Sequence, residues 1–450
     1  MKGEGEVGGG ARGLLTGRRR SGASHTPGGS GGSSPRASTS VAGVHLTRLA
    51  LTDFRSFAAA DLELSPGVST FTGANGQGKT NLVEAAAYVA TFGSHRVATD
   101  APLIRHGAQR AIIRALVTSA ARDSLIEIEV NPGKANRVRL NRVPLPRPRE
   151  ALGTLCCVLF APEDLTMVKG DPDQRRRYLD DLLVATRPRF AGVRADYERV
   201  LRQRTALLKS ARATGARPQG AGAAVPRGSV PRGSVPSALE VWDEHLVEKG
   251  AELTAGRLEL TAALRPLVGK AYAAVSGEDL GAGMSYRQAG GSAGPGGPGA
   301  PRGNPPGTPR DNGDPPADRA ALADGLRQAL ERSRRAELER GVCLVGPHRD
   351  ELELRIGELP ARGYASQGES WSLALALRLA AYDLLRSGGE DPVLILDDVF
   401  AELDDGRRER LAGLVSGAEQ VLVTAAVPAD VPAQLTGPRF EVSGGAICRA

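Results

Sequence analysis

Apolar and polar residues alternate along several short stretches in the first third of the chain. Positions 45–52 and 60–64 alternate around a turn, and positions 111–117 and 124–130 do so again. This alternation indicates half-buried strands, and each pair is predicted to be antiparallel. Residues 155–160 instead form a continuous apolar run, which favours a strand buried on both faces.

A helical period governs the middle of the chain. Apolar residues recur every three or four positions over 190–207 and 239–267, and Arg204, Lys249 and Gly256 interrupt the two stripes. This spacing predicts helices that pack along one seam, as in a short coiled-coil arm. A further helix is predicted at 317–340, a strand at 341–345, and a turn with an alternating strand at 346–356.

Three stretches lack the apolar residues that a core requires. Residues 1–43 are rich in Gly, Ser and Arg, residues 211–237 contain VPRGS twice in tandem, and residues 288–318 are rich in Gly and Pro. We predict that all three are disordered, the last two as insertions between arm helices. Regular patterning begins abruptly at Val44, so a mis-assigned start is one interpretation of the first 43 residues.

The stretch FTGANGQGKTNLVE, at 71–84, contains the pattern G-x-x-x-x-G-K-T. Its glycines allow a sharp turn that directs N–H groups at a phosphate chain, and its lysine adds a positive charge beside the terminal phosphates. A predicted strand precedes the loop and a predicted helix at 80–90 follows it, so phosphates would lie at a helix N-terminus. The expected nucleotide-binding residues are Gly73, Ala74, Asn75, Gly76, Gln77, Gly78, Lys79 and Thr80.

Acidic residues end a second apolar strand, at 393–396. We expect Asp397 to hold Mg²⁺ together with Thr80, and Asp398 to act with Lys79 in catalysis by polarising the attacking water. A further strand at 421–424 would place Thr424 near the γ-phosphate. ATP and Mg²⁺ are therefore the predicted cofactors.

Ser366 precedes an Ala- and Leu-rich helix. A Ser-x-Gly segment at a helix start offers free N–H groups to an anion, although any capped helix looks similar. The pattern alone is weak evidence for a binding site.

The distribution of charge along the chain bears on its binding partner. The net charge is +7, but residues 1–43 hold six Lys/Arg against two Glu, so the total says little. Residues 174–209 carry ten Lys/Arg against four Asp/Glu, which favours a polyanion, with a solvated helix face as the alternative. Arg175, Arg176 and Arg177 lie in this stretch and are the candidate contacts for such a polyanion, which the family resemblance described below implies is DNA.

Cysteine usage and hydropathy bear on location. The cysteines lack metal-ligand spacing, and no apolar run approaches the length of a membrane span. We therefore expect a cytoplasmic chain with reduced structural thiols. The cysteines are Cys156, Cys157, Cys343 and Cys448.

Taken together, the motifs resemble the ABC-type ATPase heads of the SMC group, and within it the RecF family of bacterial DNA replication and repair proteins. The resemblance spans about 44–442 apart from the two insertions. The stretches that carry it are NGQGKTNLVEA (75–85), GSHR (93–96), PEDLTMVKGDPDQRRRYLD (162–180), GPHRDEL (346–352), SQGESWS (366–372) and LDDVFAELD (396–404).

The resemblance implies an α/β fold, an ABC/SMC-type P-loop ATPase head with an inserted α-helical coiled-coil arm domain. The head would comprise 44–165 and 341–450, and the arm 166–340. It also implies an ATP-dependent homodimer in which one chain's Ser366, Gly368 and Glu369 contact ATP on the other, with Leu403 and Asp404 as the D-loop. Further implications are binding of double-stranded and gapped DNA, weak DNA-stimulated ATP hydrolysis, and action with RecO and RecR in loading recombinase.

Three features depart from the wider pattern of ABC ATPases. Asp398 stands where most have glutamate, no histidine follows Thr424, and residues 162–164 occupy the place of a Q-loop glutamine. His95 and Arg96 are interpreted either as reaching the nucleotide or the helix end, or as solvated loop residues.

Other classes fit less well. A transporter subunit would keep its motifs close together, whereas 287 positions separate Lys79 from Ser366. A nucleotide kinase would not need the Ser366 segment. A DNA scaffold that uses ATP only to dimerise is not separated from an ATPase by the sequence.

Overall fold

The computed structural model describes residues 43–119, 122–213, 234–278, 280–289, 318–389 and 391–450. These residues belong to one compact unit, Val41–Ala450. The predicted disorder of residues 1–42 and of most of the two insertions lies outside the described residues. Within them, no helix is long and apolar enough to cross a membrane.

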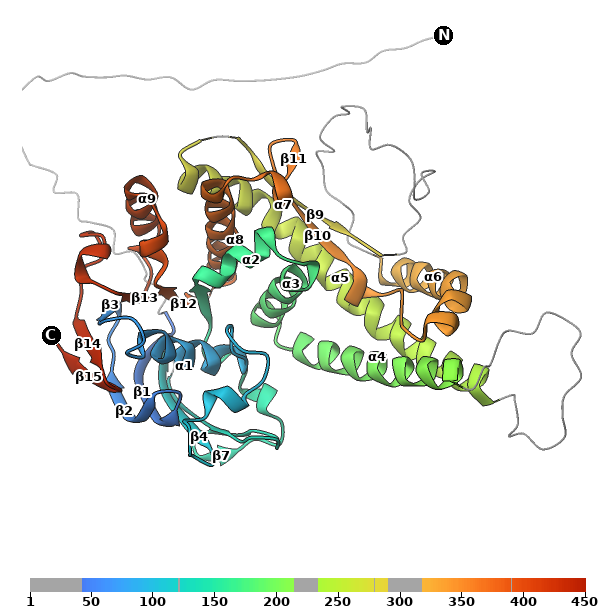
Figure 1. The fold of residues 1–450 in the computed structure, drawn as a ribbon, viewed down its shortest axis with the longest axis horizontal. Coiled ribbons are helices and arrows are strands. Elements are labelled where there is room, and N and C mark those ends of the chain that lie inside the picture. Colours follow the sequence, from blue (N-terminus) through green and yellow to red (C-terminus); the bar gives the residue numbers. More distant parts are fainter. Residues whose placement is uncertain (1–42, 120–121, 214–233, 279, 290–317, 390) are drawn as a thin grey trace, which may run out of the picture. The chain divides into compact units, whose positions relative to one another are not determined.

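Two six-stranded sheets form one half of this unit (Figure 1). The first is antiparallel and contains the two predicted strand pairs. In spatial order its strands are β2 (Phe57–Glu63), β1 (His45–Phe54), β4 (Ala111–Ser119), β5 (Arg122–Val130), β6 (Arg137–Leu140) and β7 (Val143–Pro144).

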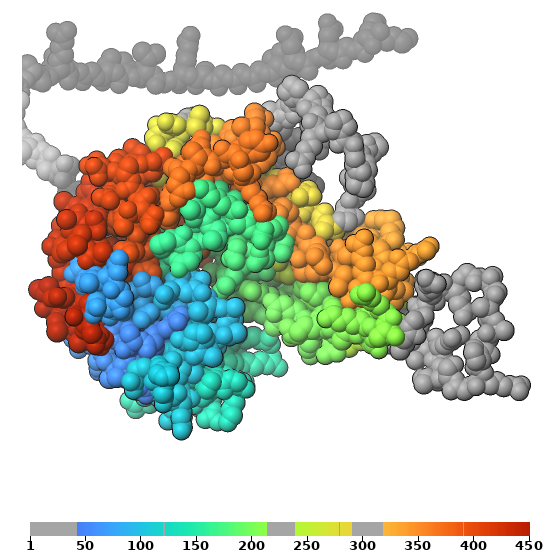
Figure 2. Space-filling model, viewed as in Figure 1, coloured from blue at the N-terminus to red at the C-terminus, as the bar shows by residue number. Residues whose placement is uncertain are grey.

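The second sheet is parallel over five strands, and an antiparallel strand closes one edge. It joins both ends of the sequence, because β3 lies between strands from the C-terminal region. Figure 2 shows the blue and red segments meeting on one surface. The order is β15 (Ala446–Arg449), β14 (Arg439–Ser443), β3 (Gly67–Thr72), β13 (Gln420–Ala425), β12 (Val393–Asp397) and β8 (Cys157–Phe160).

Helices cover both faces of the parallel sheet, which explains its continuous apolar strands. Along β12, Val393 and Ile395 pack in the core that contains α1 (Lys79–Thr91) and the antiparallel sheet. The alternate residues Leu394 and Leu396 pack in the core that contains α8 (Gln367–Ser387). Both faces of the strand are therefore buried, although its side chains still alternate.

Long helices form the other half of the unit. We call α4, α5 and α6 the arm; α4 and α5 run side by side away from the sheets (Figure 1). Besides α1 and α8, the α-helices of the described residues are α2 (Leu165–Lys169), α3 (Pro172–Thr186), α4 (Phe190–Ala213), α5 (Ser234–Ser276), α6 (Arg319–Arg340), α7 (Ala361–Tyr364) and α9 (Asp405–Val415). A small sheet of β11 (Leu359–Pro360), β10 (Glu351–Ile356) and β9 (Ala282–Arg287) packs on α5.

Two local predictions are wrong. Residues 341–345 form no strand: Gly341 ends α6 in a left-handed conformation, and the Leu344 N–H donates to the Glu337 side chain. The Glu337 side chain thus bonds a backbone N–H that a neighbouring strand would bond in a sheet. The bounds of the first insertion also differ, because α4 continues to Ala213 and α5 already begins at Ser234.

Candidate functional site

The loop from β3 to α1 has the conformation that its glycines predict. Gly78 precedes α1 with a φ of 112°, and a Cβ there would lie 2.7 Å from the Ser56 hydroxyl oxygen. Any larger residue would therefore be strained and would clash with the turn between β1 and β2. The loop and that turn fit against each other only with glycine at this position.

The Lys79 side chain folds back over this loop and is buried. Its ammonium group donates to the Gly73 carbonyl at 2.7 Å, the Ala74 carbonyl at 3.2 Å and the Asn75 side-chain oxygen at 3.4 Å. Phosphate oxygens would be stronger acceptors than these neutral groups because they are charged. The loop thus presents a cation and a helix N-terminus at the same place.

The acidic end of β12 meets the start of α1. Asp397 Oδ1 accepts hydrogen bonds from the Thr80 hydroxyl at 3.0 Å and the Thr424 hydroxyl at 2.7 Å. The first contact joins residues 317 positions apart in the chain. Because β12 and β13 are parallel, with Asp397 opposite Thr424, both strands deliver these side chains to the same edge of the sheet.

Burial raises the pKa of Asp397 to about 6, and the nearby charges of Glu163 and Asp398 add to the rise. Glu163 lies in a short turn, Pro162–Asp164, directly after β8, which neighbours β12. The segment predicted to stand in for a Q-loop therefore lies at the same sheet edge. Its Asp164 carboxylate accepts from Arg378 on α8 at 2.6 Å.

Asp398 has an uncommon conformation and an unsatisfied oxygen. Its φ is 55°, in the left-handed region, and its N–H donates to the Thr424 hydroxyl at 2.9 Å. Its Oδ1 atom is buried and has no hydrogen-bond partner among the described residues. A strained acid with a free acceptor beside the Thr80–Asp397 pair fits a site for water or a cation.

These oxygen groups suit Mg²⁺ chemically, since it prefers carboxylate, hydroxyl and phosphate oxygens. No group of three or more His, Cys, Asp or Glu side chains that could hold a metal ion occurs in the described part of the chain. Thr80 and Asp397 would therefore hold the ion together with phosphate oxygens.

Glu84 on α1 is the centre of a buried polar cluster that the sequence analysis missed. Its side chain is fully buried, yet it accepts from Arg55 at 2.6 and 2.8 Å and from the Ser94 hydroxyl at 2.5 Å. Arg96 approaches it at 3.5 Å and donates to Asn81 at 3.0 Å. A carboxylate amid the apolar residues of α1 was the only sequence signal for this cluster.

His95 lies between Ser94 and Arg96, the two contacts of Glu84 in this loop, and its surroundings distinguish the two interpretations given above. Its ring is mostly buried, burial lowers its pKa to about 4, and both ring nitrogens lack a partner among the described residues. The solvated-loop interpretation is therefore wrong for His95. Arg96, in contrast, reaches the first turn of α1 through Asn81.

The signature segment forms the N-terminus of α8. The Ser366 hydroxyl accepts from the Glu369 N–H at 3.2 Å, and the Glu369 carboxylate accepts from the Ser366 N–H at 2.8 Å, which makes a capping box. Within the described residues, no hydrogen bond or ion pair joins residues 366–369 to the loop 73–80. Within one chain, therefore, no such bond links these two predicted parts of the site.

Arg407 on α9 connects the signature segment to the D-loop. Its Nε atom donates to the Ser372 hydroxyl at 3.0 Å, and its guanidinium forms an ion pair with Asp404. A Cβ on Gly368 would lie 2.9 Å from this guanidinium, so the glycine leaves space for it. The Arg407 charge also helps to lower the pKa of Glu369, after the dominant hydrogen bond from Ser366.

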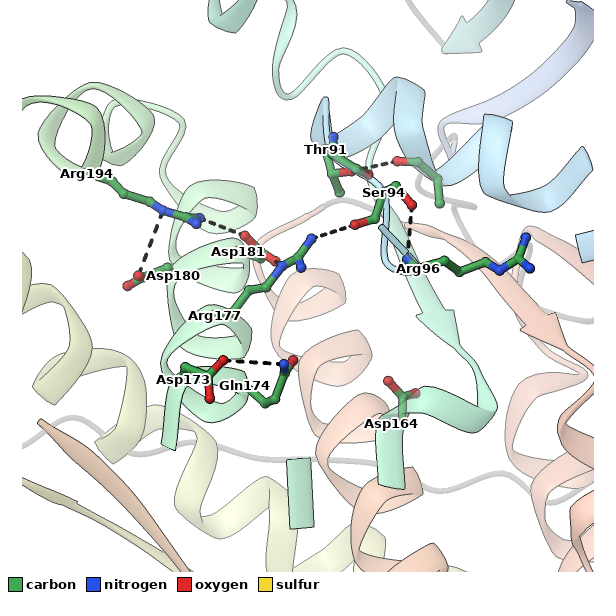
Figure 3. Close-up of polar contacts among 12 residues, drawn as sticks. Thr91, Ser94, Arg96, Asp164, Asp173, Gln174, Arg177, Asp180, Asp181 and Arg194 are labelled. Atoms are coloured by element: carbon green, nitrogen blue, oxygen red, sulfur yellow. Dashed lines mark hydrogen bonds and ion pairs between the residues drawn. The ribbon is translucent and has the colours of Figure 1, made fainter. Parts of the chain in front are cut away.

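The prediction that Arg175 contacts DNA is wrong. Its guanidinium is buried and donates to Glu351 at 2.8 Å and to the Met167 and Gly170 carbonyls at 3.0 Å. Arg176 donates to the Asp350 carbonyl at 2.8 Å. Arg177 donates to the Ser94 carbonyl at 2.6 Å and pairs with Asp181, as Figure 3 shows.

Most of the basic stretch on α4 is similarly compensated, although the exposed Arg202 and Lys209 have no ion pair among the described residues. Arg194 lies near Asp180 and Asp181 of α3 (Figure 3). Fully buried Arg204 donates to Asp243 and Glu337, both at 2.6 Å. The other pairs of this stretch are Arg187–Glu259, Arg189–Glu252, Arg194–Glu198 and Arg199–Asp196.

Comparisons with known proteins agree with this geometry. The model of the RecF/RecN/SMC N terminal domain matches residues 45–431. The DNA replication and repair protein RecF of Frankia alni is 54% identical over 408 residues, covering 90% of this chain and all of that protein. The protein of the same name from Streptomyces avermitilis is 55% identical over 406 residues, with the same coverage.

Solved structures agree on the fold. A structure described as the recombination mediator protein RecF-ATPrS in the RecFOR pathway has a TM-score of 0.75 and 26% identity, covering 91% of this chain and 98% of that one. A structure described as RecF-ATP in the same pathway has a TM-score of 0.74. The predicted fold class, an ATPase head with an inserted helical arm, is confirmed. The chain belongs to the RecF family of DNA replication and repair proteins.

Proposed function

We propose that this chain binds ATP with Mg²⁺ at the loop 73–80 and uses it to form a homodimer on DNA during recombinational repair. The observation that carries the proposal is the Thr80–Asp397 hydrogen bond of 3.0 Å, which joins the two predicted halves of the nucleotide site. Solved relatives described as RecF-ATP and RecF-ATPrS support ATP as the ligand.

At this site, Lys79 exchanges its three neutral oxygen acceptors for the β- and γ-phosphates. Asp397, ionised above its pKa of about 6, would hold the metal together with Thr80. When bound, Mg²⁺ would neutralise charge on the phosphates. Asp398, whose Oδ1 is free of partners among the described residues, accepts a proton from the attacking water.

The partner chain completes the site through its signature segment. The N-terminus of α8 offers backbone N–H groups, and Arg407 offsets the carboxylates of Asp404 and Glu369 beside it. Without that offset, two acids would repel the triphosphate. Ser366 and Gly368 would then contact the γ-phosphate held by the other chain's Lys79.

The proposal extends to partners. Closed dimers hold double-stranded or gapped DNA and act with RecO and RecR to load recombinase in the cytoplasm, and slow hydrolysis releases the DNA. The support is family membership together with the description of solved relatives as recombination mediators of the RecFOR pathway.

Light scattering with and without ATP–Mg²⁺ tests the core of this proposal. The wild-type chain should dimerise only with ATP, Ser366→Arg should bind ATP but stay monomeric, and Lys79→Met should do neither. A monomer under all conditions would overturn the sandwich. So would a Ser366→Arg variant that dimerises like the wild type.

Asp398→Asn separates an ATPase from a scaffold that uses ATP only to dimerise. If hydrolysis opens the dimer, the variant should stay dimeric far longer after ATP is added. Equal dimer lifetimes for the variant and the wild type would favour the scaffold.

A further inference from the structure

The hairpin β6–β7 and its flanks carry the densest unbroken positive charge in the first sheet. Residues 131–149 contain six Lys/Arg and no Asp or Glu. We call them the basic hairpin; β7 labels it at the outer edge of the sheet in Figure 1. Its cations are Lys134, Arg137, Arg139, Arg142, Arg147 and Arg149.

These cations point away from the core. Val138 is buried, so its neighbours Arg137 and Arg139 lie on the opposite, exposed face of β6. Arg137 approaches Glu129 at 3.5 Å and shares it with Arg110. Glu127, opposite Arg139, is already bonded to Arg114 at 3.0 Å. Glu129 is thus shared between Arg137 and Arg110, and Glu127 is committed to Arg114.

Four of the six cations are exposed and have no counter-charge among the described residues. In the described part of the chain, no ion pair or side-chain hydrogen bond involves Lys134, Arg139, Arg142 or Arg147, and all four are exposed. These side chains are free to bind an anion. Most α3–α4 arginines, by contrast, would first have to break existing hydrogen bonds or ion pairs; Arg202, which is exposed and has no ion pair among the described residues, is the exception.

The turn has an arginine where glycine would be favoured. Asn141 and Arg142 connect β6 to β7 with φ values of 51° and 69°, the left-handed pair of a two-residue hairpin turn. Asparagine tolerates this conformation, whereas arginine adopts it at a cost in stability. An arginine in this strained conformation points to a role for its charge.

Edge protection is the competing explanation, because charge and proline on an edge strand prevent pairing with other chains. Pro144 on β7 already serves that purpose. The tip residue Arg142 lies outside both strands and cannot block edge pairing. Protection therefore accounts for the proline but not for the tip arginine.

The base of the hairpin is hydrogen-bonded to α1 and to the segment that follows it. Asn136 donates to the Tyr88 hydroxyl on α1 at 3.0 Å and to the Asp100 carboxylate at 2.6 Å. The Asn131 N–H donates to the Asn136 side chain at 3.0 Å. The cations are thus carried on a rigid support attached to the helix that follows the P-loop.

We propose that the basic hairpin binds the phosphate backbone of duplex DNA, an inference that rests on the DNA binding proposed above. Five of the six cations are arginines, whose forked guanidinium groups match phosphate oxygens. Residues 131–149 contain no aromatic side chain on which unpaired bases could stack. The chemistry fits a backbone contact that reads no sequence.

Arg142→Gly combined with Arg139→Gln tests this surface. Anisotropy of a fluorescein-labelled duplex, measured with ATP–Mg²⁺ at several salt concentrations, should show roughly fivefold to tenfold weaker binding at low salt. The slope of log affinity against log salt should fall by about two, one for each lost phosphate contact. Arg142→Gly alone should raise the melting temperature slightly, because glycine relieves the strained turn.

Arg199→Gln combined with Arg335→Gln on the arm is the matched control, because it removes the same charge from exposed arginines that have acidic partners. Its duplex affinity should change less than about twofold. Unchanged affinity in the hairpin variant, or an equal loss in the control, would overturn the inference. A wild-type chain that binds no duplex would instead overturn the proposed function, while ATP-dependent dimerisation shows that each variant is folded.

Discussion

Two basic regions of this molecule have opposite surroundings. Residues 174–209 carry ten Lys/Arg, and residues 131–149 carry six. In the first region, Arg175 and Arg204 are buried and bonded to acids, and most of the other arginines are paired. In the second, four cations are exposed without a counter-charge among the described residues.

The difference comes from the neighbours that the fold supplies. Helices α3 and α4 pack against α5, α6 and β10, which bring Asp243, Glu337 and Glu351 to their arginines. The basic hairpin lies at the edge of its sheet, so among the described residues β5 is the only strand of the rest of the sheet that pairs with it. Local charge density therefore does not identify a binding surface until the packing partners are known.

The largest expected effect concerns the paired region. Arg204→Ala leaves Glu337 buried without a cation, because both side chains have zero exposure. Breaking such a pair costs about 3–5 kcal/mol. Chemical denaturation should show this loss, and the exposed Arg335→Ala on α6 should change stability by less than about 0.5 kcal/mol. A small loss for Arg204→Ala would mean that the arm arginines are not structural.

The next largest effect is a dependence on pH, which we expect at the proposed nucleotide site but not at the basic hairpin. Burial raises the pKa of Asp397 to about 6, so its ionisation destabilises the fold above pH 6, and this penalty disappears as the pH falls toward 4. Asp397→Asn should therefore raise the melting temperature at pH 7.5. ATP–Mg²⁺ binding should weaken by up to about tenfold per pH unit below 6.

The hairpin guanidinium groups do not titrate in this range. Their contribution to duplex affinity should stay constant between pH 5.5 and 7.5. It is measured as the ratio of the dissociation constants of Arg142→Gly and the wild type for duplex DNA. A ratio that changes with pH would show that the hairpin and the nucleotide site do not act separately.

The smallest expected effect is that of Arg177→Gln on DNA binding. Arg177 is partly exposed, but it is held by Asp181 and the Ser94 carbonyl. Duplex affinity should change less than about twofold, in the same anisotropy assay as for the hairpin variants. A loss as large as that of Arg142→Gly would remove the distinction between the two regions and restore α3 as a DNA contact.

Local patterns were sufficient for much of the nucleotide site. The strand, glycine loop and helix around Lys79 are contiguous in sequence, and the strand before Asp397 has four apolar residues in a row. Parallel strands direct their ends to one edge, so Thr80, Asp397 and Thr424 could be expected to meet. Their proximity was predictable because it follows from the topology of the sheet.

Contacts between distant segments were beyond the reach of the sequence. Arg407 lies against Gly368, and Glu84 binds Arg55 and Ser94, although no periodicity links these positions. The predicted strand at 341–345 failed because Glu337 satisfies its backbone instead. Each of these outcomes depends on which side chains the packing brings within hydrogen-bond distance.

The sequence by itself determined the glycine loop, the acidic strand end, the capped start of α8 and the long helices of the arm, because each depends on residues close together in the chain. Only the tertiary structure decided which arginines are neutralised. Arg175 and Arg142 are equally charged in the sequence, but one meets Glu351 inside the molecule and the other ends a hairpin in solvent. A charge remains free to bind DNA only where the fold brings no acid to it.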